Sequence, residues 1–355
     1  MEAAYVSGSI AAVISLLAVV GLRPIARKIR LVDLPNHRKS HKGAVPLIGG
    51  VSAFAGLLVA WLISMPVANG FGIYLLCSLL LVVLGAIDDA RDIPARFRLW
   101  AQVALGALLA MGSGVYLTTL GNLLGFGSIS LGWFGPLVTV AAVICATNAY
   151  NMMDGIDGLA GSMSLVTLVS LACLFSLAPG FSLELALAVT IGMALIPFMA
   201  ANLRIYPFRK KIFMGDAGSM FIGFSVVWLL VNGAQETDAA FRPVTALWLI
   251  AVPLMDMVAI MIRRARKGQS IMAPDREHLH HICMRAGFSD RQALLLITMV
   301  SIILAGIGVV GEMVQAPEWL MFALFLVVFF LYDYALTHVW RLLVVFRKYS
   351  RSKAA

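Results

Sequence analysis

The feature that most constrains this chain is its long stretches without a charged side chain. One stretch runs from Gly43 to Ile87 and another from Leu99 to Met153. A helix of about 20 apolar residues is long enough to cross a bilayer. Of all 355 residues, 61% are hydrophobic and only 13% are charged, whereas soluble domains carry charge on about a quarter of their residues. The sequence therefore excludes a water-soluble globular domain and predicts an all-α polytopic membrane protein.

Turn-forming residues divide the apolar sequence into about eleven expected transmembrane helices. Their approximate ranges are 5–22, 45–66, 71–87, 99–119, 131–147, 160–178, 184–202, 218–233, 244–262, 293–311 and 317–336. The longer hydrophilic connections lie near 23–44, 88–98, 148–158, 203–217 and 263–291. None of them is long enough for a separate domain, so we expect one integral membrane domain over residues 1–355.

The distribution of basic residues predicts the orientation. With this division, every one of the 27 Lys and Arg residues except Arg242 falls on one side of the membrane. Cytoplasmic loops are the ones enriched in Lys and Arg. We therefore expect a periplasmic N-terminus and a cytosolic C-terminus. The net charge of +9 follows from this topology, so we expect membrane lipids and no nucleic acid as partners.

Acidic residues gather at the expected cytosolic ends of three spans. Asp88 and Asp89 follow one span, Asp154 and Asp157 follow another, and Asp216 follows a third. A solvated helix cap would explain any one of them, but charges beside hydrocarbon are costly and tend to be kept for function. Carboxylates hold Mg²⁺ through a few oxygens and leave other positions for substrate phosphates. The pattern favours phosphoryl transfer at the cytosolic face.

Other polar residues accompany these aspartates. Asn148 and Asn151 are three residues apart and share a helical face, and Phe213 offers an aromatic ring for a base. The segment 276–281 contains three histidines beside an arginine and suits a pyrophosphate or sugar hydroxyls better than zinc, because no partner has zinc-site spacing. Asp256 lies inside an expected span and needs a polar partner.

Taken in order, five segments resemble the polyprenyl-phosphate N-acetylhexosamine-1-phosphate transferase family. They are LVDLPNHRKSHKGAVPLIGG (31–50), IDDARDIPARFRL (87–99), NAYNMMDGIDGLAG (148–161), FMGDAGS (213–219) and PDREHLHH (274–281). The resemblance implies an enzyme of the bacterial inner membrane with its active site on the cytosolic face. It also implies transfer of GlcNAc-1-phosphate from UDP-GlcNAc to undecaprenyl phosphate with Mg²⁺ or Mn²⁺. The products would be UMP and the lipid-linked pyrophosphoryl sugar that begins enterobacterial common antigen or O-antigen synthesis.

The resemblance also implies roles for individual residues. Asp88 and Asp89 match the catalytic aspartate pair, Asp216 matches a metal ligand, and Asn151 matches the asparagine near that metal. With the residue patterns above, it predicts substrate binding by Asn148, Asp154, Asp157, Phe213, Arg276, His278, His280, His281, Lys42 and Arg98. Phe213 would lie beside uracil, and Lys42 and Arg98 near the lipid phosphate. A phosphate monoester loses its second proton near pH 6, so we expect the catalytic pair to position the nucleophile more than to deprotonate it.

Two alternatives remain compatible with the sequence. A phospho-MurNAc-pentapeptide transferase of peptidoglycan synthesis would share much of the same chemistry with a different donor. A secondary transporter would share the composition, but transporters place their polar groups near the bilayer midplane, whereas these carboxylates lie at span ends. The full donor selectivity and the existence of a homodimer are left open.

Overall fold

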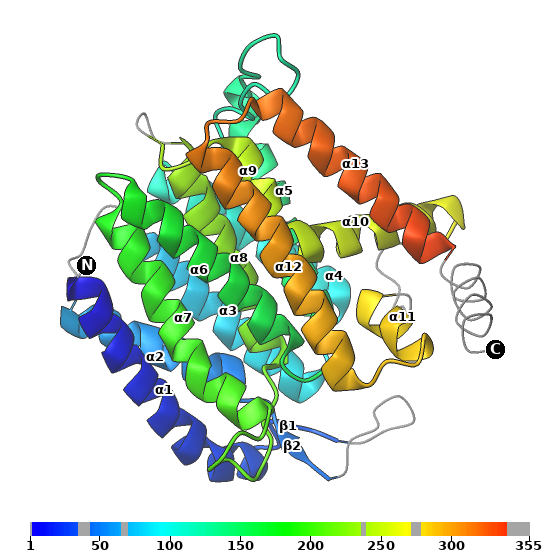
Figure 1. Cartoon of the computed structure of the whole chain (residues 1–355). Helices are drawn as coiled ribbons and strands as arrows, with labels where there is room; N and C mark the ends of the chain where they lie inside the picture. The colour runs from blue at the N-terminus through cyan, green and yellow to red at the C-terminus, as the bar shows by residue number, and fades with distance from the viewer. Residues whose placement is uncertain (1, 35–42, 65–69, 236–238, 271–277, 339–355) are drawn as a thin grey trace, which may run out of the picture.

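The computed structural model describes residues 2–34, 43–64, 70–235, 239–270 and 278–338. Within these ranges the chain is a bundle of helices with one short β-hairpin (Figure 1). The helices are α1 (Glu2–Lys28), α2 (Gly49–Ser64), α3 (Phe71–Arg91), α4 (Ala95–Ser113), α5 (Gly135–Met152), α6 (Leu159–Leu177), α7 (Ser182–Asn202), α8 (Gly215–Gln235), α9 (Pro243–Leu249), α10 (Ala251–Arg266), α11 (Leu279–Arg285), α12 (Asp290–Met313) and α13 (Glu318–Thr337). A 3-10 turn, η1 (Gly132–Phe134), precedes α5.

Each expected span overlaps at least one helix, and the all-α polytopic membrane architecture is confirmed. Eight helices of the described ranges are long and apolar enough to cross a membrane, or nine if α9 and α10 form one broken span. Helix α2 has only 16 residues, and α4 carries Arg96 and Arg98 near its start. The number eleven therefore stays a prediction.

The expected span 244–262 is not one continuous helix. Helix α9 ends at Leu249, α10 begins at Ala251, and the two axes differ by 84°. Pro253 lies in the first turn of α10, where a missing backbone N–H is tolerated. Inside one continuous helix, Pro253 would remove a hydrogen bond and clash with the preceding turn, which favours the break. The break turns α10 across the bundle towards α13 (Figure 1).

Helix α8 forms the centre of the bundle. Its most apolar 18-residue window is entirely buried, and it packs against α2, α3 and α5. A Cβ atom added to Gly50 in α2 would lie 2.0 Å from the Cα atom of Gly218 in α8. Small residues allow this close approach between membrane helices, so the first turn of α8, which contains Asp216, is fixed by its neighbours.

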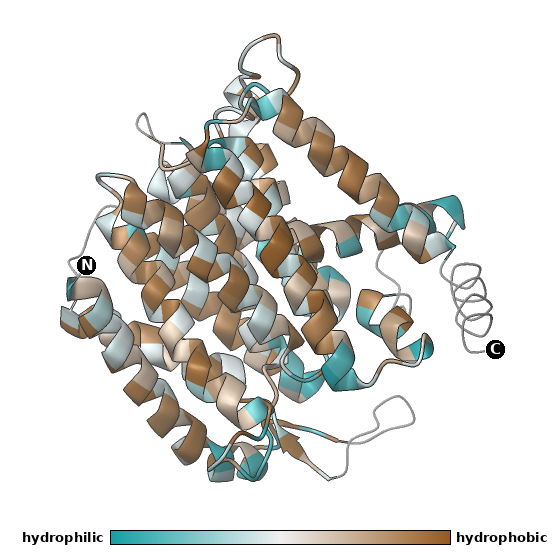
Figure 2. Cartoon of the chain, in the orientation of Figure 1, coloured by the Kyte–Doolittle hydropathy of each residue, from teal (hydrophilic) through white to brown (hydrophobic). Residues whose placement is uncertain are grey.

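Hydrophilic residues, coloured teal, gather along the lower end of the bundle (Figure 2). A hairpin that the sequence did not predict lies there, formed by the antiparallel strands β1 (Val32–Asp33) and β2 (Val45–Pro46). The backbone N–H of Phe213 donates to the carbonyl of Pro46 at 2.9 Å, which ties the segment before α8 to this hairpin. The hairpin thus positions one wall of the cavity described next.

Candidate active site

One cavity of about 900 Å³ opens at this polar end of the bundle. All five hydrophilic connections that were expected on one side of the membrane contribute to its lining, through Asp33, Asp88, Asp154, Phe213 and His281. The sequence-predicted site residues that line it are Asp88, Asp89, Asp154, Asp157, Phe213, Asp216 and His281. Folding therefore gathers the separate motifs around a single space.

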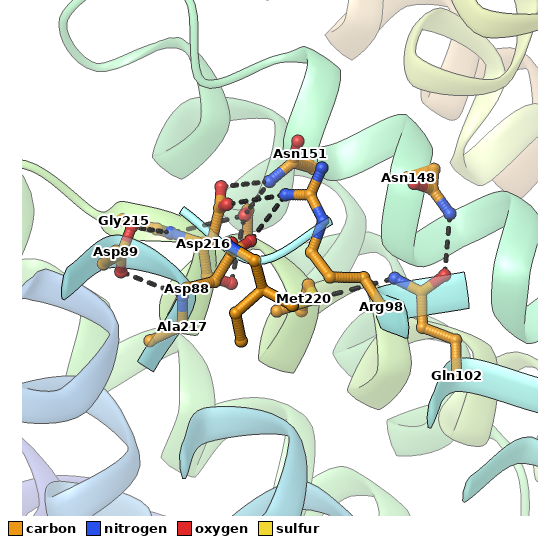
Figure 3. Close-up of polar contacts among 12 residues, drawn as sticks. Asp88, Asp89, Arg98, Gln102, Asn148, Asn151, Gly215, Asp216, Ala217 and Met220 are labelled. Atoms are coloured by element: carbon orange, nitrogen blue, oxygen red, sulfur yellow. Dashed lines mark hydrogen bonds and ion pairs between the residues drawn. The ribbon is translucent and has the colours of Figure 1, made fainter. Parts of the chain in front are cut away.

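Asp89 holds the start of α8. Its Oδ1 accepts a hydrogen bond from the backbone N–H of Asp216 at 2.9 Å, and its Oδ2 accepts one from Ala217 at 3.3 Å (Figure 3). The first N–H groups of a helix have no partner within the helix, and here a side chain from α3 supplies it. Gly215 has a φ of +75°, and a Cβ atom there would lie 2.4 Å from Asp89 Oδ2. Glycine is thus required where Asp89 meets α8.

Arg98 joins two carboxylates from different helices. Its Nη1 donates to Asp88 Oδ2 at 2.6 Å and to Asp216 Oδ2 at 2.9 Å (Figure 3). The other oxygen of Asp88 accepts from the backbone N–H of Ile93 at 2.7 Å, and Asn151 Nδ2 donates to Asp216 Oδ1 at 2.6 Å. Helices α3, α4, α5 and α8 therefore meet in one charged network at the cavity wall.

Negative charge exceeds positive charge at this network. The Asp154 carboxyl opens onto the cavity, yet partial exclusion of bulk water by the protein, together with the charges of Asp216 and Asp157, raises its pKa to about 7. A carboxyl whose pKa is raised by neighbouring carboxylates marks a place where a cation would be bound favourably. A bound metal ion would supply the positive charge that balances these aspartates.

The carboxylate and amide oxygens gathered here fit Mg²⁺ or Mn²⁺, which prefer such ligands. Asp216 and Asn151 are the predicted metal residues, and Asp88, Asp89 and Asp154 line the same cavity. In the ranges that the structure describes, no three His, Cys, Asp or Glu side chains form a complete site by themselves. Mg²⁺ is commonly held by one or two carboxylates, while substrate phosphates and water complete its shell.

Phe213 and Asp157 share a basic partner that sequence reasoning missed. Lys211 Nζ pairs with Asp157 Oδ1 at 2.6 Å and lies 4.4 Å from the centroid of the Phe213 ring. Lys211 also lines the cavity. In the sequence, only its position two residues before the FMGDAGS motif pointed to a role for Lys211. The fold shows that it contacts residues of two separate motifs.

The three histidines have different surroundings. His281 lines the cavity, whereas His278 and His280 are buried behind it. A Cβ atom on Gly155 would lie 2.0 Å from His280 Nε2, so the His280 ring packs directly on the loop that carries Asp154. Burial, followed by the nearby rings of His281 and His278, lowers the pKa of His280 to about 3, and its ring is uncharged at neutral pH.

Asn148 does not line the cavity and donates to Gln102 Oε1 at 2.9 Å (Figure 3), so its binding role stays a prediction. Lys42 and Arg276 lie outside the described residues.

Comparison with known proteins places this site in a family. Residues 71–234 match the family described as Glycosyl transferase family 4. The chain is 46% identical over 330 residues to an undecaprenyl-phosphate alpha-N-acetylglucosaminyl 1-phosphate transferase of Yersinia pestis, covering 93% of this chain and 90% of the relative. The chain belongs to this transferase family. Relatives of the same name from Escherichia coli strain K12 and Pasteurella multocida are 45% and 46% identical and cover 90% and 92% of this chain, and 87% and 91% of their own lengths.

Membership in Glycosyl transferase family 4 confirms the family expected from the ordered motifs. The matched range contains the Asp88–Asp89 pair, Arg98, the asparagines, the Asp154–Asp157 loop and Asp216, but neither the hairpin nor the histidines. The alignments with the three relatives extend over nearly the whole chain. This breadth also disfavours the transporter alternative.

Proposed function

We propose that this chain transfers GlcNAc-1-phosphate from UDP-GlcNAc to undecaprenyl phosphate. The observation that carries the proposal is the cavity at the polar end of an apolar bundle. Aspartates from three helix ends line it, and Arg98 pairs with two of them, Asp88 and Asp216. A soluble nucleotide sugar and the phosphate head of a membrane lipid can both reach such a place. The names of relatives at 45–46% identity support the donor sugar and the acceptor lipid.

In the proposed reaction an oxygen of the lipid phosphate attacks the β-phosphorus of UDP-GlcNAc. The bond between that phosphorus and the bridging oxygen breaks, and UMP leaves with the oxygen. Asp216 and Asn151, with the nearby carboxylates, would hold Mg²⁺ or Mn²⁺, which neutralises charge on the phosphates when bound. Asp89 orients the first turn of α8, and Asp88 orients Arg98 towards the reacting phosphates. Because both aspartates are committed to these contacts, the proposal gives them positioning roles rather than a role as general base.

The donor site follows from the cavity lining. Phe213 offers a ring for uracil, Lys211 beside it offers a cation for the diphosphate, and His281 offers a contact to the sugar-phosphate part. A phospho-MurNAc-pentapeptide donor is the second candidate within the family's chemistry, but the relatives' names favour the N-acetylglucosaminyl donor.

The proposed topology has about eleven spans, a periplasmic N-terminus and a cytosolic C-terminus in the bacterial inner membrane. The collection of the five hydrophilic connections, four of which contain Lys or Arg, around one cavity supports it. The product would begin enterobacterial common antigen or O-antigen synthesis.

One assay tests the proposal. Membranes containing the protein receive UDP-GlcNAc labelled in the sugar, undecaprenyl phosphate and Mg²⁺. We expect labelled lipid and an equal amount of UMP, with both lost when a chelator is added. Release of UDP instead of UMP, or label transfer only from UDP-MurNAc-pentapeptide, would contradict the proposed reaction.

A further inference from the structure

Asp256 is a buried carboxylate that the proposed reaction does not use. It lies in α10, just after the break from α9, and has no exposed surface. Burying an ionised carboxyl is costly unless hydrogen bonds compensate it. Its surroundings must therefore supply donors, and the structure provides three.

All three donors come from the C-terminal part of the chain. His278 Nδ1 lies 2.9 Å from Asp256 Oδ2, the backbone N–H of Leu279 donates to Oδ1 at 3.0 Å, and the Tyr332 hydroxyl donates to Oδ1 at 2.8 Å. An ionised carboxylate only accepts hydrogen bonds. The contact with Asp256 Oδ2 is satisfied when the His278 ring carries a proton on Nδ1, so Asp256 is placed to set both the tautomer and the orientation of that ring.

A continuous series of contacts leads from Asp256 to the cavity. The His278 and His280 rings stack at 5.7 Å with an interplanar angle of 8°, and the His280 and His281 ring centroids are 4.2 Å apart. His280 packs on Gly155, next to Asp154, and His281 lines the cavity. A change in the position of His278 would therefore move both His281 and the loop that carries Asp154.

We propose that Asp256 is a positioning residue that acts through His278 to place the histidine segment at the nucleotide-sugar end of the cavity, with Tyr332 of α13 holding Asp256 in turn. This inference rests on the proposed function. It also assigns a role to α13, whose candidate span is only 22% buried. At metal sites, a carboxylate that orients a histidine ligand typically contributes 10- to 100-fold to affinity or activity, and we expect an effect of the same size for the orientation of His278.

The test compares Asp256→Asn, His278→Ala and the double variant in the purified full-length enzyme. Asparagine keeps the shape but can present an N–H to His278 Nδ1, which favours the other tautomer. We expect Asp256→Asn to lower kcat/KM for UDP-GlcNAc by roughly 10- to 100-fold and to leave KM for undecaprenyl phosphate within about threefold. The double variant should match His278→Ala within about twofold, because groups that act through one another are not additive. Multiplying losses, or wild-type kinetics of Asp256→Asn, would overturn the proposal.

A milder pair of variants covers the case in which Asp256→Asn does not fold. Tyr332→Phe removes one donor to Asp256, and we expect a loss of roughly three- to tenfold in the same parameter. Tyr334→Phe makes the identical change two residues away on α13, at a side chain that is 59% exposed, and should leave kinetics within twofold of wild type. Equal kinetics of the two variants would overturn the role of Tyr332 and, with it, the proposal.

A spectroscopic measurement separates this proposal from the proposed function. In protein labelled with ¹⁵N-histidine, the ring signals that disappear in His278→Ala identify His278. We expect a proton on Nδ1 in the wild type and a shift to the Nε2-protonated tautomer in Asp256→Asn. An unchanged tautomer overturns the positioning role. If the wild type fails to use UDP-GlcNAc while the tautomer shift is seen, the proposed donor is wrong and Asp256 still positions His278.

Discussion

Replacing Gly215 with alanine tests whether Asp89 and the start of α8 form the structural basis of the active site. Two costs follow from the geometry. The positive φ of +75° is unfavourable for alanine by about 1 kcal/mol. The new Cβ atom would also lie 2.4 Å from Asp89 Oδ2, about 1 Å closer than an ordinary contact, so the carboxylate must move away from the N–H groups of Asp216 and Ala217.

Complete loss of these two hydrogen bonds would cost at most about 1.5–3 kcal/mol each, and their partial weakening adds about 1–4 kcal/mol in all. With the backbone cost of about 1 kcal/mol, we expect Gly215→Ala to lower the free energy of unfolding by about 2–5 kcal/mol. A shift of about 1 Å at a reacting group costs on the order of 100-fold in rate, and we expect kcat to fall by that amount. The assay measures UMP release and thermal unfolding on the same detergent-purified sample.

Gly114→Ala is the matched control. Gly114 also has a positive φ of +72°, but nothing lies within 4 Å of a Cβ atom added there. Gly114→Ala therefore introduces the backbone strain and does not displace Asp89. We expect this variant to lose about 1 kcal/mol of stability and to keep its kcat within about twofold. If Gly215→Ala behaves like Gly114→Ala in both measurements, Asp89 does not need its place at the start of α8 and the reasoning fails.

Three further predictions concern charge at the cavity. Asp216→Asn should lower activity at least about 100-fold, because a lost metal contact is worth several kcal/mol, with partial recovery in excess Mn²⁺; near-normal turnover at low Mg²⁺ would refute the metal role. Arg98→Ala should raise KM for undecaprenyl phosphate about tenfold, equivalent to about 1.4 kcal/mol, and leave KM for UDP-GlcNAc within threefold, as steady-state kinetics with each substrate varied will show. The pKa of Asp154 is raised to about 7 from about 4 in the unfolded chain. Between about pH 4 and pH 7 the folded state therefore binds a proton that the unfolded state does not. The free energy of unfolding of the metal-free protein should fall as the pH rises over this range. Melting curves should show a smaller fall in Asp154→Asn, and Mg²⁺ should reverse the fall in the wild type. Identical pH profiles of the wild type and Asp154→Asn would contradict this prediction.

The sequence by itself determined the class of protein and the segments that form its site. Hydropathy and charge act locally and add along the chain, so the long uncharged stretches were enough to predict a polytopic membrane protein. The expected helices follow from the same property. The ordered motifs were enough to predict the family, because the residue types near Asp88, Asp154 and Asp216 are those that phosphate and metal chemistry requires.

Only the tertiary structure decided which of these residues act together. Arg98 contacts Asp216 across 118 positions of sequence. That contact exists because α3 and α5 pack against the buried α8, and α4 packs against both of them. The break between α9 and α10 directs Asp256 to His278, a pairing that neither spacing nor composition shows. Contacts of this kind depend on how helices cross and where their ends meet, and those properties arise from packing between segments that are remote in the chain.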